Sequence, residues 1–293
     1  MIKTKIALIG VSYNSDPSAI RFIEGLSTLL LDDVEFTIIL VDNTERHNSE
    51  VFFNQIHAKN KHVICIKAQD NLGYFGGARL GLSTYLEKNE YPDWLIISNV
   101  DIEFRDPKFL QILKACSNIE NIGVIAPAIL SIFSQRDINP KIFKRPSKRK
   151  MKFYKQIFSN YYLMNCYGLL SAAKFKTSIF LKGKLFRKQI IRDNKGTRYS
   201  TEKWSAIYAP HGSCIIFSKV FFLRGGSLNY PQFLFNEEIF VGETTRKLGL
   251  KVIYFPKLKV IDEEHISTGI IRSRRIASYV ADSAKFVADT FFK

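Results

Sequence analysis

The sequence predicts an α/β fold in which helices flank a parallel β-sheet. Short apolar runs, typical of strands buried on both faces, lie at residues 5–13, 36–41 and 63–67, and each ends in polar residues. Segments that predict helices lie between these runs. Because such alternation indicates right-handed crossovers, we expect one large α/β domain or two small ones in the 293 residues.

A fourth run, residues 94–104, ends in the acidic residues Asp101 and Glu103. Ligands of open α/β sheets bind outside the carboxyl ends of the strands, and residues spaced i, i+2 share one side of an extended chain. Carboxylates placed there are hard ligands that suit Mg²⁺ or Mn²⁺ bridging a phosphate. The alternative is that both acids only open the next loop, before a helix that begins at Asp106 and Pro107.

A glycine-rich turn at residues 70–79 follows the third strand and opens a helix that runs through Leu86. A dinucleotide-binding site needs G-x-G-x-x-G directly after the first strand, but that strand ends in Ser12-Tyr13-Asn14. We therefore expect the glycines to allow close approach of the backbone to a ligand or to a neighbouring strand.

Two acidic segments stand out in the second half. Glu237 and Glu238 lie at the start of a predicted helix that ends at Leu248, where the helix dipole favours acids. The functional alternative is that carboxylates among phenylalanines have the raised pKa of a general base. His265 follows an apolar strand in the second segment, although a lone histidine is more often structural.

Further elements are predicted around these segments. The final helix carries an apolar stripe, so it could dock on the protein body, a partner subunit or a membrane. The predicted elements are strands at 123–127, 207–217 (two strands joined by a Pro-His-Gly turn) and 252–255, a helix from residue 220, and the final helix at 270–292.

The net charge of +16 comes from one basic segment. Seventeen of the 43 lysines and arginines, but one of the 27 acids, lie between Lys141 and Arg198, so the rest of the chain is neutral. Aromatic residues are interleaved with these cations, and residues 157–173 are apolar and aromatic. We interpret this segment as an insertion on the rim of the fold. It could bind an anionic membrane surface, form a solvated loop or bind nucleic acid.

The cysteines and the apolar runs indicate a compartment. Four widely spaced cysteines without a C-x-x-C pair are typical of reduced thiols in a cytoplasmic protein. The first residues do not read as a signal peptide, and no apolar run approaches the roughly 18 residues that span a bilayer. We therefore expect a cytoplasmic location.

Taken together, the motifs resemble those of the inverting glycosyltransferases of family 2, in the rhamnosyltransferase-like branch that builds bacterial surface polysaccharides. The resemblance covers residues 5–130 and 204–268 and leaves out the basic insertion. No single motif is decisive, but their order and spacing are specific. In chain order the motifs are Tyr13-Asn14, Val41-Asp42-Asn43, Asn71-Leu72-Gly73 with Gly76-Gly77, Asn99-Val100-Asp101, His211-Gly212-Ser213, Glu237-Glu238 and His265.

The resemblance implies a role for each motif. It makes Asp101 a metal ligand to the donor diphosphate, with His265 completing the metal shell. It makes Glu238 the base that deprotonates the acceptor hydroxyl, with Glu237 as the alternative. The N-x-D form of the family's D-x-D element places Asn99 where other members have an aspartate. The residues implied to line the nucleotide-sugar site are Tyr13, Asn14, Asp42, Asn43, Asn71, Gly73, Tyr74, Gly77, Asn99, Val100 and His211.

The implied fold is the GT-A type, a nucleotide-binding sheet flanked by helices, here with a basic insertion and a C-terminal amphipathic helix. The implied parts are a nucleotide-sugar half at 1–135, the insertion at 136–203 and an acceptor half at 204–293. With Mn²⁺ or Mg²⁺, such an enzyme would move a sugar from dTDP-rhamnose or a UDP-hexose to a lipid-linked or polysaccharide acceptor. It would act at the inner face of the plasma membrane on an anionic surface, and a homodimer is compatible with it.

Three other functions are alternatives to this one. A nucleotidyltransferase also uses acids and a metal, but its glycine-rich basic signature near the first strand is missing here. A nucleic-acid-binding protein would act through the basic segment and leave the acidic motifs without a use. A catalytically inactive scaffold is favoured by Asn99 but not by the presence of Asp101, Glu238 and His265.

Overall fold

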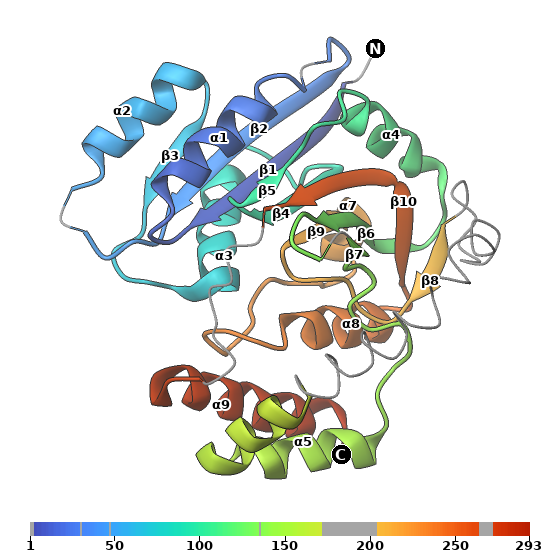
Figure 1. Ribbon diagram of the computed structural model, residues 1–293. Helices are drawn as coiled ribbons and strands as arrows, with labels where there is room; N and C mark the ends of the chain where they lie inside the picture. The colour runs from blue at the N-terminus through green and yellow to red at the C-terminus, as the bar shows by residue number, and fades with distance from the viewer. Residues whose placement is uncertain (1–2, 30, 47, 135, 172–203, 264–271) are drawn as a thin grey trace, which may run out of the picture. The chain divides into compact units, whose positions relative to one another are not determined.

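The computed structural model describes residues 3–29, 31–46, 48–134, 136–171, 204–263 and 272–293 (Figure 1). Contacts within the chain divide it into two units. Unit 1 comprises Met1–Arg145 and Trp204–His265, and unit 2 comprises Pro146–Lys203 and Ile266–Lys293.

A ten-stranded mixed sheet forms the centre of unit 1 within the described residues. Its order is β3-β2-β1-β4-β9-β6-β10-β5, with β7 beside β6 and β8 beside β10. The strands are β1 (Thr4–Ser12), β2 (Val34–Asp42), β3 (Ile64–Lys67), β4 (Trp94–Asn99), β5 (Ile102–Glu103), β6 (Ile122–Ser131), β7 (Arg136–Asp137), β8 (Ser205–Ile207), β9 (Cys214–Ser218) and β10 (Lys251–Asp262).

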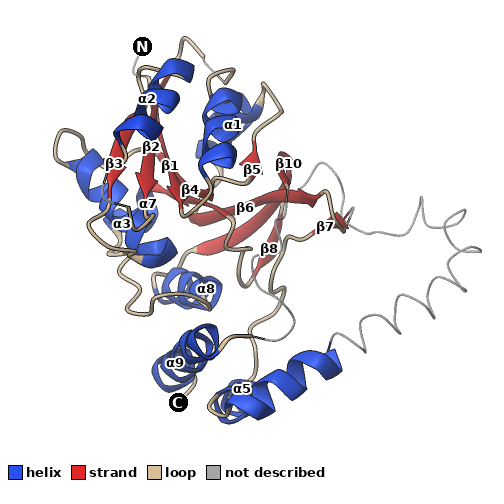
Figure 2. Ribbon diagram, turned by 60° about the vertical axis from the view of Figure 1, so that its left-hand side comes forward, coloured by secondary structure: helices blue, strands red, loops and turns tan. Residues whose placement is uncertain are grey.

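Helices cover both faces of the parallel part of this sheet. Successive side chains of a strand point to opposite faces, so Ile6 and Leu8 of β1 join the core beneath α1, whereas Ile9 lies under Gly81 of α3. Figure 2 shows α1 and α3 on opposite sides of these strands. The helices of unit 1 are α1 (Asp16–Leu26), α2 (Glu50–Lys59), α3 (Gly73–Leu86), α4 (Phe109–Ala115), α7 (Lys219–Leu223) and α8 (Glu237–Lys247), with a short 3₁₀ turn at Cys116–Asn118.

The expectation of a parallel sheet holds for the first four strands of the sheet order and for the pair β6 and β10, but not for β9. Strands β3, β2, β1 and β4 are parallel, as the alternation of strands and helices predicts. Strand β9 runs antiparallel to both β4 and β6. The reason is the turn at residues 208–213, which brings the chain back to the sheet at the carboxyl end of β4 without a crossover helix.

Strand β10 also differs from the prediction of separate strands around Pro256. It is one strand of 12 residues, and its register against β6 shifts between Phe255 and Lys259. Proline has no N–H to donate to a neighbouring strand, so the irregularity accommodates Pro256 while the pairing resumes beyond it. The far end of β10 then pairs with β5, the short strand after Asp101.

Unit 2 contains the basic segment from Pro146 onward, and its described residues are mostly helical. It comprises α5 (Lys148–Phe158), a helix at residues 161–171, and α9 (Arg274–Phe291), which packs against α5. Helix α9 begins later than the predicted residue 270, because the hydroxyl of Ser273 caps it by accepting from the N–H of Ile276. In the part of the chain that is described, no helix has the length and apolarity needed to cross a membrane.

Candidate active site

The carboxyl ends of the parallel strands bring the sequence-predicted motifs to one edge of the sheet. Ser12 at the end of β1 lies opposite Asp42 of β2, and Val11 lies opposite Asn99 of β4. The N–H of Asn99 donates to the carbonyl oxygen of Ser213 (2.9 Å), just before β9. This edge therefore joins the early motifs to the histidine-containing turn at residues 208–213.

The glycine-rich turn connects this edge to the segment before the acid pair. The N–H of Gly73 donates to Asn71 Oδ1 (3.0 Å), and its carbonyl oxygen accepts from Asn43 Nδ2 (2.8 Å). Gly73 has a φ of +71°, and a Cβ there would lie 2.1 Å from the carbonyl oxygen of Phe233. Only glycine fits this conformation and this contact. Gly77 is similarly close, since its Cβ would lie 3.0 Å from Asn43 Nδ2.

Tyr74 follows Gly73 in the glycine-rich turn. Its hydroxyl is buried and has no hydrogen-bond partner in the described parts of the chain. Burial raises the pKa of Tyr74 well above its usual value, and Glu237, Asp101 and Glu238 raise it further through their charge. Cys214 also raises this pKa.

The acid pair begins α8, as the sequence predicts. The two residues that precede the pair adopt left-handed conformations, Phe235 with a φ of +71° and Asn236 with a φ of +60°. Such conformations cost energy for residues other than glycine. The hydroxyl of Tyr230 donates to the carbonyl oxygen of Phe235 (2.6 Å) and helps to hold this bend. The bend sets the direction in which Glu237 and Glu238 enter the helix.

The two carboxylates differ in environment. Glu237 is buried, and its burial and the neighbouring Glu238 hold its pKa well above the usual range of glutamate. Glu238 is only partly buried and lies against the histidine turn, where a Cβ on Gly212 would be 3.4 Å from Glu238 Oε1.

His211 in this turn is held in one orientation. The imidazole Nδ1 of His211 lies 2.8 Å from the hydroxyl of Ser213, and the backbone N–H of His211 donates to Asn139 Oδ1 (2.8 Å). Burial, together with the charge of Lys141, lowers the pKa of His211 to about 3. The imidazole is therefore neutral at physiological pH and offers polar contacts without a charge.

Glu243, which the sequence did not single out, fixes the turn to α8. Its fully buried carboxylate accepts from Arg145 Nε (2.6 Å), from the hydroxyl of Tyr208 (2.8 Å) and from Arg246 Nη2 (2.8 Å). Burial alone would raise the pKa of Glu243, but these hydrogen bonds lower it overall. Gly242 adds a close backbone contact, because its Cβ would lie 2.6 Å from the Tyr208 carbonyl oxygen.

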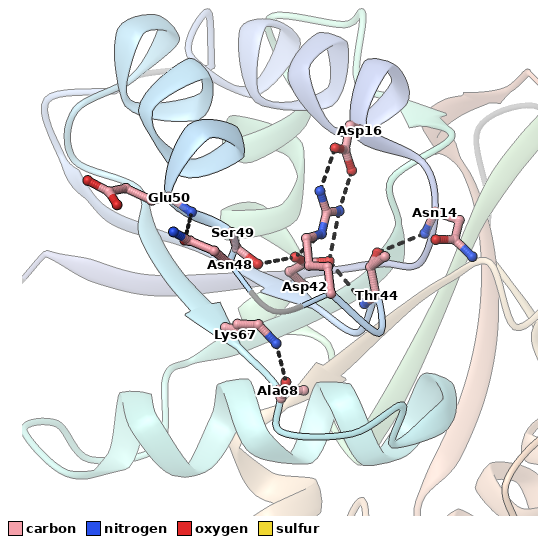
Figure 3. Close-up of polar contacts among 10 residues, drawn as sticks. Asn14, Asp16, Asp42, Thr44, Asn48, Ser49, Glu50, Lys67 and Ala68 are labelled. Carbon is pink, nitrogen blue, oxygen red and sulfur yellow. Dashed lines mark hydrogen bonds and ion pairs between the residues drawn. The ribbon is translucent and has the colours of Figure 1, made fainter.

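Asp42 and the residues around it form a second cluster that the sequence did not reveal (Figure 3). The carboxylate of Asp42 is fully buried and accepts from the N–H of Thr44 (3.0 Å) and the hydroxyl of Ser49 (2.7 Å). Arg46 lies 3.0 Å from Asp42 and also bonds both carboxylate oxygens of Asp16. The contacts of the Asp42 carboxylate are therefore with the protein itself.

The first motif follows β1 directly. Tyr13 exposes 44% of its surface, and Asn14 adopts a positive φ of +50°. The N–H of Asn14 donates to the hydroxyl of Thr44 (2.9 Å), which joins this motif to the loop after β2 (Figure 3). Val100, in contrast, is buried and packs into the core rather than toward a ligand.

Asp101 lies just after β4, beside the end of β10. The carbonyl oxygen of Asp101 accepts from the N–H of Glu263 (3.2 Å), so the segment that leads toward residue 265 runs beside Asp101. His265 itself lies outside the described residues. Glu103 is engaged in an ion pair with Arg105. Within the described ranges, no three His, Cys, Asp or Glu side chains gather as a metal site.

Comparisons with known proteins agree with this architecture. No model of a known protein family matches the chain. The chain is 22% identical over 294 residues to the N-acetylglucosaminyl-diphospho-decaprenol L-rhamnosyltransferase of Mycobacterium tuberculosis (strains CDC 1551 / Oshkosh and ATCC 25618 / H37Rv). This match covers 97% of the chain and 84% of that protein.

Solved structures share the fold. GalNAc-T7 with UDP, GalNAc and Mn²⁺ matches with a TM-score of 0.57 and 12% identity, over 91% of this chain and 44% of that one. S. aureus TarS 1-349 with UDP-GlcNAc matches with a TM-score of 0.55 and 10% identity, over 91% of this chain and 60% of that one. The mannosyltransferase PcManGT from Pyrobaculum calidifontis with GDP-Man and Mn²⁺ matches with a TM-score of 0.51 and 10% identity, over 90% of this chain and 59% of that one. The chain thus spans less than two thirds of each of these proteins.

The mixed sheet, the motifs at its carboxyl edge and these relatives lead to one conclusion. The solved structures confirm the predicted α/β architecture, in which a central sheet is flanked by helices. The rhamnosyltransferase relative extends over nearly the whole chain. The chain therefore has the fold of these glycosyltransferase structures and is similar over nearly its whole length to a rhamnosyltransferase.

Proposed function

We propose that this protein transfers one sugar from dTDP-rhamnose or a UDP-hexose to a hydroxyl of a lipid-linked glycan, with inversion of the anomeric carbon. The observation that carries the proposal is that Glu238 lies against the histidine turn, and that this turn is bonded through Ser213 to Asn99, two residues before Asp101. Carboxylates can supply both a base and a cation ligand. The relative named as a rhamnosyltransferase acting on N-acetylglucosaminyl-diphospho-decaprenol supports rhamnose and a lipid-linked acceptor.

Glu238 is the proposed general base. It is less buried than Glu237 and stands beside the histidine turn, where an acceptor hydroxyl can approach. As the acceptor oxygen bonds to the anomeric carbon, Glu238 takes its proton and the diphosphate leaves with the electrons of the broken C–O bond. Glu237, whose raised pKa favours the neutral form, removes a repulsive charge from beside the base.

We propose that a divalent cation binds at Asp101. Its carboxylate is a hard oxygen ligand at the carboxyl end of β4, and the segment leading to His265 runs beside it. Mn²⁺ or Mg²⁺ bound there would neutralise charge on the departing nucleotide diphosphate. Two of the similar solved structures, GalNAc-T7 and PcManGT, contain Mn²⁺. We propose that Asp101 and His265 hold the cation, with Asn99 beside them.

The nucleotide sugar would lie along the same edge of the sheet. The turn at Asn71 and Gly73 is fixed by Asn43, and the absence of a side chain at Gly77 lets this turn pack closely. Asp42 would act by holding the loop after β2 in place, since its carboxylate is bonded within the protein. The other proposed contacts with the donor are Tyr13, Asn14, Tyr74 and His211, whereas Val100 supports this edge from the core.

The proposed division places donor binding in residues 1–135 and acceptor binding in residues 204–293, with the insertion at 136–203 between them. We propose that the enzyme works at the cytoplasmic face of the plasma membrane, where a lipid-linked acceptor would be found. Residues 138–192 contain no acidic residue, which suits an anionic lipid surface. A homodimer is compatible with this arrangement.

Nucleotide binding tests the donor site directly. The wild type, D101N and D32N are compared by thermal shift with dTDP, UDP and GDP, with and without Mn²⁺. Asp32 is an exposed acid on another part of unit 1 and serves as the matched control. Binding at one hundred times Kd stabilises the fold by about 2.7 kcal/mol. A Mn²⁺-dependent shift that D32N keeps and D101N loses would support the proposal. A shift that D101N keeps in full would refute the role of Asp101.

A further inference from the structure

The helix at residues 161–171 of unit 2 exposes one apolar face. Tyr162, Leu163, Leu169 and Leu170 leave 69%, 49%, 47% and 71% of their surfaces exposed. Together with the exposed Cys166, they follow the spacing i, i+1, i+4, i+7, i+8, which places them on a single side of a helix. We refer to these five residues as the apolar stripe.

The other face of this helix is packed, so the direction of the apolar stripe is fixed. Met164 is buried, and the ring of Tyr167 lies 5.8 Å from that of Phe158 and 6.0 Å from that of Tyr154. Asn165 Oδ1 accepts from the N–H of Arg272 (2.9 Å). Contacts with α5 and with the residues before α9 therefore hold the helix in one rotation.

The helix of the apolar stripe and helix α5 contain no acid, and Asp289 of α9 pairs with Lys155 of α5. Residues 156–173 contain no charged side chain, and residues 138–192 contain no acid. Helix α5, which packs against the helix of the stripe, exposes Lys148, Arg149, Lys150 and Lys152. An uncharged apolar face beside a purely basic helix is the pattern of helices that lie in the interface of an anionic bilayer.

We propose that the apolar stripe inserts into the boundary between headgroups and acyl chains of an anionic bilayer, while the cations of α5 bind lipid phosphates. The choice of a bilayer, rather than a second copy of the chain, rests on the proposed function, since a lipid-linked acceptor lies in a membrane. The charge adds to this choice, because a second copy would bring an equally basic surface against the first.

The experiment measures binding of the full chain to vesicles by co-sedimentation. Vesicles of phosphatidylglycerol with phosphatidylcholine are compared with vesicles of phosphatidylcholine alone. The stripe variant is L163S/L170S. Its matched control is V51S/L223S, which removes two equally exposed apolar side chains from unit 1. A third variant, K148S/R149S/K152S, removes three of the cations.

We expect the wild type and V51S/L223S to bind the anionic vesicles. L163S/L170S should bind at least about tenfold more weakly, because two leucines no longer leave water. Each cation removed from α5 should weaken binding about fivefold, and binding should fall with added salt. An L170W variant should show a blue-shifted fluorescence spectrum on anionic vesicles, which reports insertion of the stripe itself.

Three results would overturn the proposal. The wild type could fail to bind anionic vesicles, or L163S/L170S could bind as well as its control. The third is a change of oligomeric state in L163S/L170S with vesicle binding unchanged, which would assign the stripe to a second copy. None of these measurements needs transfer activity or a donor. A failure here, with the Mn²⁺-dependent nucleotide shift intact, would therefore leave the proposed function standing.

Discussion

Removing the charge of Glu243 tests whether this buried carboxylate fixes the histidine turn to α8. E243Q keeps the size of the side chain and an oxygen that the Tyr208 hydroxyl can still donate to. It loses the ionic part of the bonds from Arg145 and Arg246. E243L loses every bond and leaves the Tyr208 hydroxyl buried without its partner.

The size of each effect follows from the exposure of the partners. The side chains of Arg145 and Arg246 are 39% and 54% exposed, so water replaces much of what they lose, and E243Q should cost about 1–2 kcal/mol. The hydroxyl of Tyr208 is buried, and stranding it adds about 1–3 kcal/mol, so E243L should cost about 3–4 kcal/mol. Y208F, which strands no donor, should cost about 1 kcal/mol.

Urea unfolding of the three variants, repeated across pH, is the assay. The folded-state pKa of Glu243 lies below its ordinary value of about 4.3, so its ionised form stabilises the fold fully above that value. This contribution is lost as pH falls through the lower folded-state pKa. The difference between wild type and E243Q should therefore shrink as pH falls below about 4.3. If E243L stays within about 0.5 kcal/mol of wild type, or E243Q is as costly as E243L, the reasoning is wrong.

Two further predictions concern the glycine-rich turn and the cluster around Asp42. G73A should destabilise by about 2–4 kcal/mol because its Cβ meets a carbonyl oxygen, whereas G225A, with positive φ but open space, should cost about 1 kcal/mol. Equal losses in thermal unfolding of the two variants would exclude the clash. R46M should cost about 2–4 kcal/mol, since it leaves the buried Asp42 carboxylate without its cation. K59M, which breaks an exposed ion pair, should stay below about 1 kcal/mol, and a loss as large as that of R46M would contradict the account.

The parallel strands of the first half could be predicted because a local sequence pattern marks each of them. Strands buried on both faces appear as unbroken apolar runs, and each run is followed by a helix with its own period. The antiparallel β9 and the continuous β10 were not predicted. Their pairing partners lie about one hundred residues away in the chain, so no local pattern reports their direction or register.

The site divides in the same way. Asp101, Glu237 and Glu238 could be proposed from the sequence, because carboxylates that directly follow an apolar run or begin a helix are visible in it. Glu243 could not, since its partner Arg145 is 98 residues away and its i, i+3 neighbour Arg246 resembles an ordinary surface pair. Only the folded chain shows that this pair encloses a fully buried carboxylate.

Transfer of labelled rhamnose from dTDP-rhamnose to a lipid-linked N-acetylglucosamine diphosphate tests the central claim most directly. The wild type should form a product with inverted configuration, UDP-hexoses serving as the alternative donors. E238Q should lose about 100-fold or more in kcat while still binding nucleotide with Mn²⁺, because only the proton acceptor is removed. E237Q should lose less, since it replaces a carboxyl group whose neutral form is favoured. Wild-type activity in E238Q, or no transfer from any nucleotide sugar, would contradict the account.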